Sequence, residues 1–404
     1  MYTQHAKIKF YLLCIAFVFL SSCVPTQEDM SGLSAFHDAR GRFRFADECI
    51  SLNNTSSSSI QFSGAIWYDE EDALHKEGRF GLHWSGGSVQ DVGSIPIDPY
   101  MMITSPSGKT AIFGGFKMGE PMGGKVYLLE GRNYQKTNLE ALGSDFVLTD
   151  DDIIMYASAD REHNTISANT YNLKTGETQK KDFFDASMSD EPLAQLSRTG
   201  ILAYDWYRNF DGPRLVLLDA KTGQEIGRYK DISYTVRPSW YGRIFDQQGT
   251  RIISISDRWD GDQPYQQELF GVQIGKTEEP LQVTDFHAKY PYTLISGFKY
   301  PRPVWSPNDR WIVLDVLISQ TKQIDSSVDT HWLFLIDLEK SIGYQICQEL
   351  GPKDSGTAVW SPDSQYFALS RNDKIWVVNP QTLESRLLVD RPGVPLSVLG
   401  WTIP

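Results

Sequence analysis

Two similar stretches near the carboxyl end, both containing Val-Trp-Ser-Pro, constrain the fold more than any other feature. Pro303–Val316 reads PVWSPNDRWIVLDV and Ala358–Arg371 reads AVWSPDSQYFALSR, and their tryptophans, Trp305 and Trp360, are 360 − 305 = 55 residues apart. A repeat of this length is typical of architectures that stack one supersecondary unit many times. Because the two tryptophans recur at one position of the unit, we expect both in the core.

Weaker copies of the same unit precede these two. Each has a short polar turn, an apolar strand, a polar loop, a second apolar strand and a further turn. No stretch of a dozen residues shows helical periodicity, and the apolar runs are rich in Val, Ile, Tyr, Phe and Trp. The sequence therefore predicts an all-β chain with six copies, whose four earlier starts are TSPSGKTAIFGG at Thr104, LTDDDIIMYAS at Leu148, LSRTGILAYDW at Leu196 and FDQQGTRIISIS at Phe245.

The two ends of the repeated region complement each other. SVLGWTIP at the carboxyl end places Trp401 where the next repeat tryptophan is due, while the segment from Ile60 has two strands without an inner one. We predict that the last strand pairs with Ile60–Asp69, because this closure leaves no open sheet edge. The expected fold over residues 60–404 is a β-propeller of seven four-stranded blades. Six blades are the alternative, if the first strands only decorate the ring.

The copies resemble the WD40-like repeats of the TolB-type β-propeller family, whose blades begin with a Trp-Ser-Pro-Asp-Gly turn. The resemblance is strong at Trp305–Asp309 and Trp360–Asp363, fair at Ser105–Gly108 and degenerate at Leu148–Asp152 and Phe245–Gly249. It implies a ring whose partners are proteins, such as other envelope lipoproteins or peptidoglycan-associated complexes. An analogy of fold does not establish function.

The amino terminus predicts export. Lys7 and Lys9 precede an apolar run too short to span a bilayer comfortably, and Leu20–Cys23 resembles the bacterial lipobox. We expect residues 1–22 to be a signal peptide, Cys23 to be lipidated and residues 23–59 to form a polar tether. The alternative is an ordinary secretory signal with a chance cysteine. The predicted location is the outer membrane in a Gram-negative cell, since no Asp follows the cysteine, and otherwise the outer face of the cytoplasmic membrane.

Charge excludes one class of partner. The formal net charge is −13, and it becomes −13 − 2 = −15 once a signal peptide with two lysines is removed. Binding to nucleic acid needs Lys and Arg to displace counterions, so a surface this acidic argues against it. Hydrophobic content of 41% describes a globular chain with a substantial core.

Two cysteines remain after export and lipidation, because Cys14 lies in the signal peptide and Cys23 would carry lipid. An oxidising compartment permits a disulfide between Cys49 and Cys347, and two buried free thiols are the alternative. The surrounding segment GRFRFADECISL (41–52) is expected to form a short strand that docks on the ring.

No motif in the sequence predicts catalysis. There is no G-x-S-x-G elbow, and Ile103 stands where a phosphate-binding loop ending in SPSGKT needs its first glycine. The histidines are scattered, and the Asp150–Asp152 run fits turn chemistry better than a cation site. We therefore predict no catalytic residue, no metal and no cofactor.

Aromatic residues in the loops that follow second strands are the candidate site. Loops of neighbouring blades emerge on one face of a propeller, so those of 205–214 and 257–265 would form one rim. Aromatic and Arg side chains dominate binding hot spots. The alternative is that these aromatic side chains fold back to cap neighbouring blades. The predicted rim consists of Trp206, Tyr207, Arg208, Asp211, Trp259, Asp260 and Tyr265.

The sequence thus predicts a lipid-anchored envelope module that recognises proteins without catalysis. The rival is a propeller lyase or glycosidase acting on carbohydrate, in which the aromatics stack on sugar rings. It would use two loop carboxylates about 5–10 Å apart, drawn from Asp211, Asp257, Asp260 and Asp262. A third alternative is a structural ring with no specific ligand.

Overall fold

The computed structural model describes residues 38–52, 60–70, 78–84, 89–95, 98–116, 124–130, 133–141, 146–160, 163, 165–184, 194–207, 213–230, 244–257, 267–276, 279–295, 304–320, 330–347 and 357–403. The chain divides into two units, Met1–Ala35 and Phe36–Pro404. The first unit and the predicted Cys23 lie outside the described residues, and every described strand belongs to the second.

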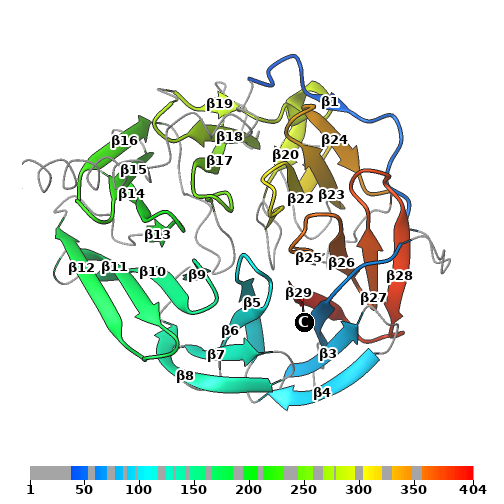
Figure 1. Cartoon of the computed structure of the whole chain (residues 1–404). Helices are drawn as coiled ribbons and strands as arrows, with labels where there is room; N and C mark the ends of the chain where they lie inside the picture. Colours follow the sequence, from blue (N-terminus) through cyan, green and yellow to red (C-terminus); the bar gives the residue numbers. More distant parts are fainter. Residues whose placement is uncertain are drawn as a thin grey trace, which may run out of the picture. The chain divides into compact units, whose positions relative to one another are not determined.

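The described strands form seven sheets arranged around a common centre (Figure 1). Five of these sheets have the four strands expected of a propeller blade. They are sheet 1, of β29 (Leu396–Thr402), β2 (Ala65–Glu70), β3 (Gly78–Trp84) and β4 (Val89–Ile95); sheet 2, of β5 (Asp98–Thr104), β6 (Thr110–Phe116), β7 (Gly124–Glu130) and β8 (Asn133–Ala141); sheet 3, of β9 (Phe146–Leu148), β10 (Ile153–Asp160), β11 (Thr165–Asn172) and β12 (Thr178–Phe184); sheet 4, of β13 (Ala194–Leu196), β14 (Ile201–Tyr207), β15 (Pro213–Asp219) and β16 (Glu225–Lys230); and sheet 7, of β25 (Thr357–Trp360), β26 (Phe367–Arg371), β27 (Lys374–Val378) and β28 (Ser385–Asp390).

Sheets 5 and 6 depart from this pattern. Sheet 5 has three described strands, β17 (Arg251–Asp257), β18 (Gln267–Gln273) and β19 (Leu281–Gln282). Sheet 6 has β20 (Tyr292–Leu294), β21 (Val304–Trp305), β22 (Trp311–Ser319), β23 (Thr330–Asp337), β24 (Ile342–Gln345) and β1 (Arg44–Phe45). The only helical turn among the described residues is η1 (Phe286–Ala288), and none of their helices is long and apolar enough to cross a membrane. The predicted all-β propeller is confirmed.

A separate apolar core fills each space between neighbouring sheets. Ala65 and Phe113 share the core between sheets 1 and 2, for example, and the other described cores continue around the ring to the pair formed by sheets 7 and 1. Each fully buried large apolar side chain contributes about 1.5–3 kcal/mol. Trp305 lies in the core between sheets 5 and 6, and Trp360 lies in the next, so their predicted core position is confirmed.

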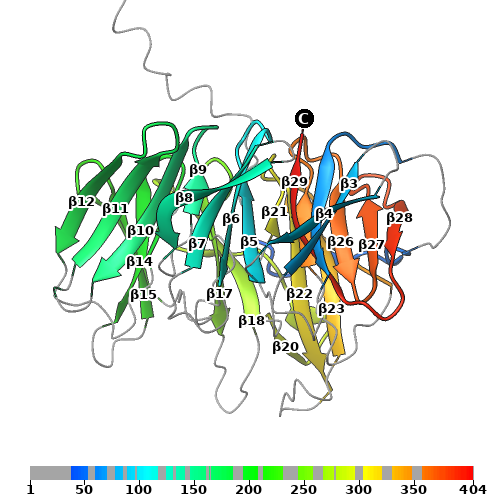
Figure 2. The ribbon, with the colours of Figure 1, turned by 90° about the horizontal axis from the view of Figure 1, so that it is seen from below.

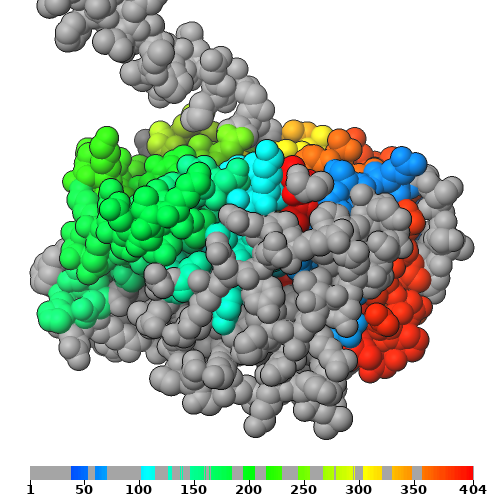
Figure 3. Space-filling model, turned by 60° about the horizontal axis from the view of Figure 1, so that its bottom comes forward, coloured from blue at the N-terminus to red at the C-terminus, as the bar shows by residue number. Residues whose placement is uncertain are grey.

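The two ends of the ring join in sheet 1. β29 pairs antiparallel with β2, and the register places Trp401 opposite Ile66. The Trp401 indole nitrogen donates to Ser63 O at 2.9 Å, and Trp67 Nε1 donates to Thr402 Oγ1 at 3.0 Å. The predicted closure by the last strand is therefore confirmed, and Figure 3 shows the red carboxyl-terminal residues emerging beside blue and cyan residues from the amino-terminal half.

A glycine makes this closure possible. Gly64 enters β2 with φ +93°, in the left-handed region that side chains disfavour. A Cβ atom at this position would lie 2.2 Å from Thr402 O, so only glycine lets the first strand approach the last. The pairing between the two chain ends therefore depends on close backbone contact as well as on the tryptophans.

Residues 38–52, called here the N-terminal belt, cross the outer edges of sheets 5, 6 and 7. The Ala39 amide donates to Gln282 O of β19 at 2.8 Å. β1 then adds to the edge of sheet 6 by pairing parallel with β24. The Ser385 hydroxyl of β28 donates to Ser51 O at 2.7 Å. The short docking strand that the sequence predicts is confirmed.

Apolar side chains of the belt enter the cores between the sheets. Phe43 packs between sheets 5 and 6, and Ile50 and Leu52 pack between sheets 6 and 7. These residues make the belt part of the compact unit, which begins at Phe36. Residues 38–52 therefore include the docking strand that was predicted inside the segment 23–59, whose other residues lie outside the described ones.

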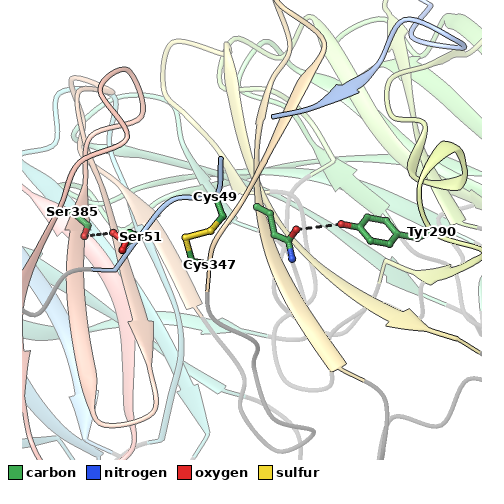
Figure 4. The surroundings of a disulfide bond; sticks show 6 residues. Cys49, Ser51, Tyr290, Cys347 and Ser385 are labelled. Atoms are coloured by element: carbon green, nitrogen blue, oxygen red, sulfur yellow. Dashed lines mark hydrogen bonds between the residues drawn. A yellow bond between two sulfur atoms is a disulfide. The ribbon is translucent and has the colours of Figure 1, made fainter. Parts of the chain in front are cut away.

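Cys49 and Cys347 form a disulfide bond, with their Cα atoms 4.9 Å apart (Figure 4). Beside it, Ile50 pairs with Ile346 in a parallel bridge, and the Cys347 amide donates to Ile50 O at 2.9 Å. Of the two alternatives that the sequence leaves open, the structure has the bond. It joins the belt to the end of sheet 6 across a sequence separation of 298 residues.

Candidate functional site

The predicted rim is described only in part. Trp206 and Tyr207 are the last two residues of β14, and they pair with Arg214 and Pro213 of β15. The loop between these strands is therefore shorter than the sequence suggested, because both strands extend into the stretch assigned to the loop. The other predicted rim residues lie outside the described residues; these are Arg208, Asp211, Trp259, Asp260 and Tyr265.

The strands that lead into the predicted rim loops end on one face of the propeller. β14 and β17 are the strands that follow the turns of sheets 4 and 5, and both run away from those turns. Because the two sheets are neighbours in the ring, β14 and β17 end on the same side (Figure 2). Their last residues are Tyr207 and Asp257. We call this side the loop face. The loops of both sheets begin there, as the sequence argument requires.

The opposite side, called here the turn face, is built from the repeated polar turns. These turns are residues 105–108, 149–152, 197–200, 246–249, 306–309 and 361–364. In sheet 6 the Trp311 amide donates to Ser306 Oγ at 2.9 Å, and in sheet 7 the Tyr366 amide donates to Ser361 Oγ at 3.0 Å. The Ser-Pro signature in the sequence thus marks a hydroxyl that closes the turn from within.

Hydrogen bonds link the turns of neighbouring sheets. The Ser107 hydroxyl of sheet 2 donates to Asp151 Oδ1 of sheet 3 at 2.5 Å. The Asn308 amide of sheet 6 donates to Ser364 Oγ of sheet 7 at 2.9 Å. At the closure, the Ile403 amide donates to Gly108 O at 2.9 Å. The turn face is therefore a structural network of polar contacts between blades.

The acidic run Asp150–Asp152 in sheet 3 is part of this network of turns. Asp150 Oδ1 accepts the amides of Asp152 and Ile153, which is turn chemistry as the sequence predicts. The hydroxyls of Ser105 and Ser107 hold the pKa of Asp151 below its ordinary value. Within the described part of the chain, no three His, Cys, Asp or Glu side chains are placed together to hold a metal ion.

One buried charge cluster was not anticipated from the sequence. Asp246, Arg251 and Asp309 meet between sheets 5 and 6, and each has at most 1% of its surface exposed. Arg251 Nε donates to Asp246 Oδ2 at 3.0 Å, and the Arg251 guanidinium lies 5.3 Å from the centre of the Trp305 ring. The only signal in the sequence was an Asp at the turn position where three other repeats have glycine.

No family model matches the chain, and no curated protein matches it. Among solved structures, an acylaminoacyl peptidase of Pyrococcus horikoshii is similar with a TM-score of 0.51 and 11% identity, over 89% of this chain and 54% of that chain. The β-propeller domain of the Trilobed protease from Pyrococcus furiosus is similar with a TM-score of 0.50 and 10% identity, over 87% of this chain and 99% of the domain.

TolB from Acinetobacter baumannii is similar with a TM-score of 0.43 and 13% identity, over 72% of this chain and 65% of that chain. This chain therefore spans just under two thirds of that TolB chain and about half of the peptidase. Identities this low show the fold alone, which is the β-propeller. The names of these neighbours include both TolB and peptidases, so they assign no activity.

Proposed function

We propose that this protein is a lipid-anchored module of the bacterial cell envelope that recognises protein partners through its loop face, without catalysis. The observation that carries the proposal is that β14 of sheet 4 and β17 of sheet 5, the strands that follow the turns, end on one face. Trp206 and Tyr207 stand at the first of these ends, and the sequence places Trp259 and Tyr265 just beyond the second. Clustered aromatics of this kind are typical of binding hot spots.

The belt and its disulfide support an exported, tethered ring. A disulfide persists in oxidising compartments, which is where a signal peptide would deliver the chain. The described residues begin at Asp38, which is 38 − 23 = 15 residues after Cys23. Fully extended, such a segment spans at most about 50 Å. Lipidation at Cys23 would therefore keep the ring within reach of the membrane surface.

Replacing Cys23 by serine is expected to release the protein from the membrane, because the lipids on this residue are the proposed attachment. Fractionation of cells that express the full chain measures this, and mass spectrometry of the amino-terminal peptide detects the lipid. The Cys49→Ser/Cys347→Ser variant is the control and should stay in the membrane fraction. Wild-type protein found entirely in the soluble fraction would contradict the anchor.

Replacing Trp206 and Trp259 together by alanine is expected to reduce the recovery of envelope partners at least tenfold. Truncating one hot-spot tryptophan costs about 2 kcal/mol or more of binding energy. The measurement is a pull-down from envelope extract with the soluble ring, followed by quantitative mass spectrometry. Gln248→Ala is the matched control, because Gln248 is exposed on the turn face.

Equal recovery of every partner by wild type and the double variant would remove the loop-face assignment. Incubation of the same protein with a panel of polysaccharides tests the rival enzyme. We expect no unsaturated or reducing products. Their appearance, and their loss when Asp257 at the end of β17 is replaced by asparagine, would favour a propeller lyase or glycosidase instead.

A further inference from the structure

The junction between sheets 5 and 6 has an unusual residue in its turn. The fourth turn residue takes a positive φ in five of the repeats, and three of the five are glycines. In sheet 6 this residue is Asp309, with φ 59°, and in sheet 7 it is Ser364, with φ 60°. Burying a carboxyl group costs free energy unless it is paired, and a non-glycine residue at positive φ adds backbone strain of a kind that clusters at switch regions.

Asp246, on the sheet 5 side, is satisfied as a carboxylate. Its Oδ1 accepts the Thr250 amide at 2.8 Å, and its Oδ2 accepts the Thr250 hydroxyl at 3.1 Å and Arg251 Nε at 3.0 Å. The positive charge of Arg251 is thus already committed to one carboxylate.

Asp309, on the sheet 6 side, is only half satisfied. Its Oδ1 accepts a hydrogen bond from the backbone N–H of Gln247 at 2.7 Å, and this bond links the two turns. Its Oδ2 is buried and has no hydrogen-bond partner among the described residues. Arg251 Nη2 donates to the backbone O of Asp309 at 2.5 Å and not to its carboxyl group. The geometry therefore assigns the proton of this acid pair to Asp309.

The electrostatics of the junction agree with this assignment. Burial, with the neighbouring Asp246 carboxylate, raises the pKa of Asp309 from 3.8 to about 7. Arg310, the next residue, does not neutralise Asp309, because its guanidinium is bound to Asp337 at 2.9 Å and to Glu339 at 3.1 Å. Among the described residues of sheet 5, Asp246 and Arg251 are the charged groups that act on Asp309.

We propose that the junction between sheets 5 and 6 is a protonation-controlled joint, which is closed while Asp309 carries a proton and loosens when the proton is lost. An ionised Asp309 would place a second carboxylate beside Asp246 with one Arg251 between them, out of contact with water. Letting water in between the two turns relieves this cost. The joint rests on the fold alone, so a failure of the proposed function leaves it untouched.

The direction of the pH dependence follows from linkage. Between about pH 4 and pH 7 the folded state binds the proton of Asp309 and the unfolded state does not, so stability falls as pH rises through this window. Above the pKa of Asp309 in the folded state, the loss of stability is complete and stability no longer depends on pH through this group. Sheet 7 has a neutral counterpart. Ser364 Oγ accepts a hydrogen bond from the backbone N–H of Asn308, and a serine hydroxyl does not ionise in this pH range.

Hydrogen exchange of the Gln247 and Gln248 amides, corrected for the intrinsic effect of pH, measures the opening of the joint. One pKa unit corresponds to a tenfold change, so the shift to about 7 allows at most about a thousandfold change. We expect opening in wild type to increase at least thirtyfold from pH 5 to pH 8. Asp309→Asn, which keeps the shape and tolerates a positive φ, should reduce this change to less than threefold.

Asp309→Ser is a second variant, which introduces the residue found at position 364 of sheet 7. The control is Asp363→Asn, which changes an exposed acid in the turn of sheet 7 and should leave the wild-type pH response intact. An unchanged pH response in either variant of Asp309 would overturn the proposal. Should neither variant fold, wild type alone decides. Exchange at Gln247 that does not change between pH 5 and pH 8 would then refute the joint.

Discussion

Replacing Trp401 by alanine is expected to lower the free energy of unfolding by about 3–5 kcal/mol, the usual cost of removing a buried tryptophan. Trp401 is 1% exposed, its ring meets Phe62 edge to face with centroids 5.2 Å apart, and its indole donates to Ser63 O. All of these contacts lie where the last strand joins the first. Urea titration followed by far-ultraviolet circular dichroism measures the change.

Two variants separate closure of the ring from general loss of core. Trp401→Phe keeps an aromatic ring and loses the hydrogen bond, so it should cost less, about 1–2 kcal/mol. Trp360→Ala removes a comparable side chain between sheets 6 and 7, away from the closure. Only Trp401→Ala should accelerate hydrogen exchange in β2 and β29 while the rest of the ring stays protected. Equal exchange in both alanine variants would contradict the closing role.

Replacing Cys49 and Cys347 together by serine is expected to lower the free energy of unfolding by about 2–5 kcal/mol. The bond restricts the unfolded chain across 298 residues, and bonds that close long loops restrict it most. The native belt keeps its other contacts, including the parallel pairing of β1 with β24 and the burial of Phe43. We therefore expect a folded but less stable ring, measured by the same urea titration.

Reduction of the wild type provides the control. A dithiol reductant should bring wild type to the stability of the double serine variant and should leave that variant unchanged. Cys49 is exposed, so the reagent has access to the bond. A wild type whose unfolding midpoint does not respond to complete reduction, verified by thiol counting, would show that the bond contributes nothing to stability.

Local patterns predicted the strands and turns well. The Ser-Pro turns at Ser306 and Ser361 were identified because turn formation depends on a few neighbouring residues; that each hydroxyl closes its turn is a finding of the structure. The loop before Pro213 was predicted too long, since Trp206 and Tyr207 are strong strand formers and extend β14. For the remaining rim residues, the role in binding stays a prediction.

Contacts between distant residues were harder to predict. The closure by Trp401 could be inferred, because the last repeat lacked outer strands and the first lacked an inner one. The cluster of Asp246, Arg251 and Asp309 could not, since each of these residues fits a turn or a strand by itself. Their proximity depends on how two blades pack, and no local pattern encodes that packing.

The sequence by itself determined the repeated blade, because alternating apolar residues and turn-forming side chains act over a few residues. It also determined how the ring closes, because an unpaired edge at each end has one natural partner. Only the tertiary structure decided which sheets the belt crosses, that Cys49 meets Cys347 and that Asp309 is buried beside Asp246. Those outcomes depend on distances between residues far apart in the chain, which are set when neighbouring sheets pack against one another.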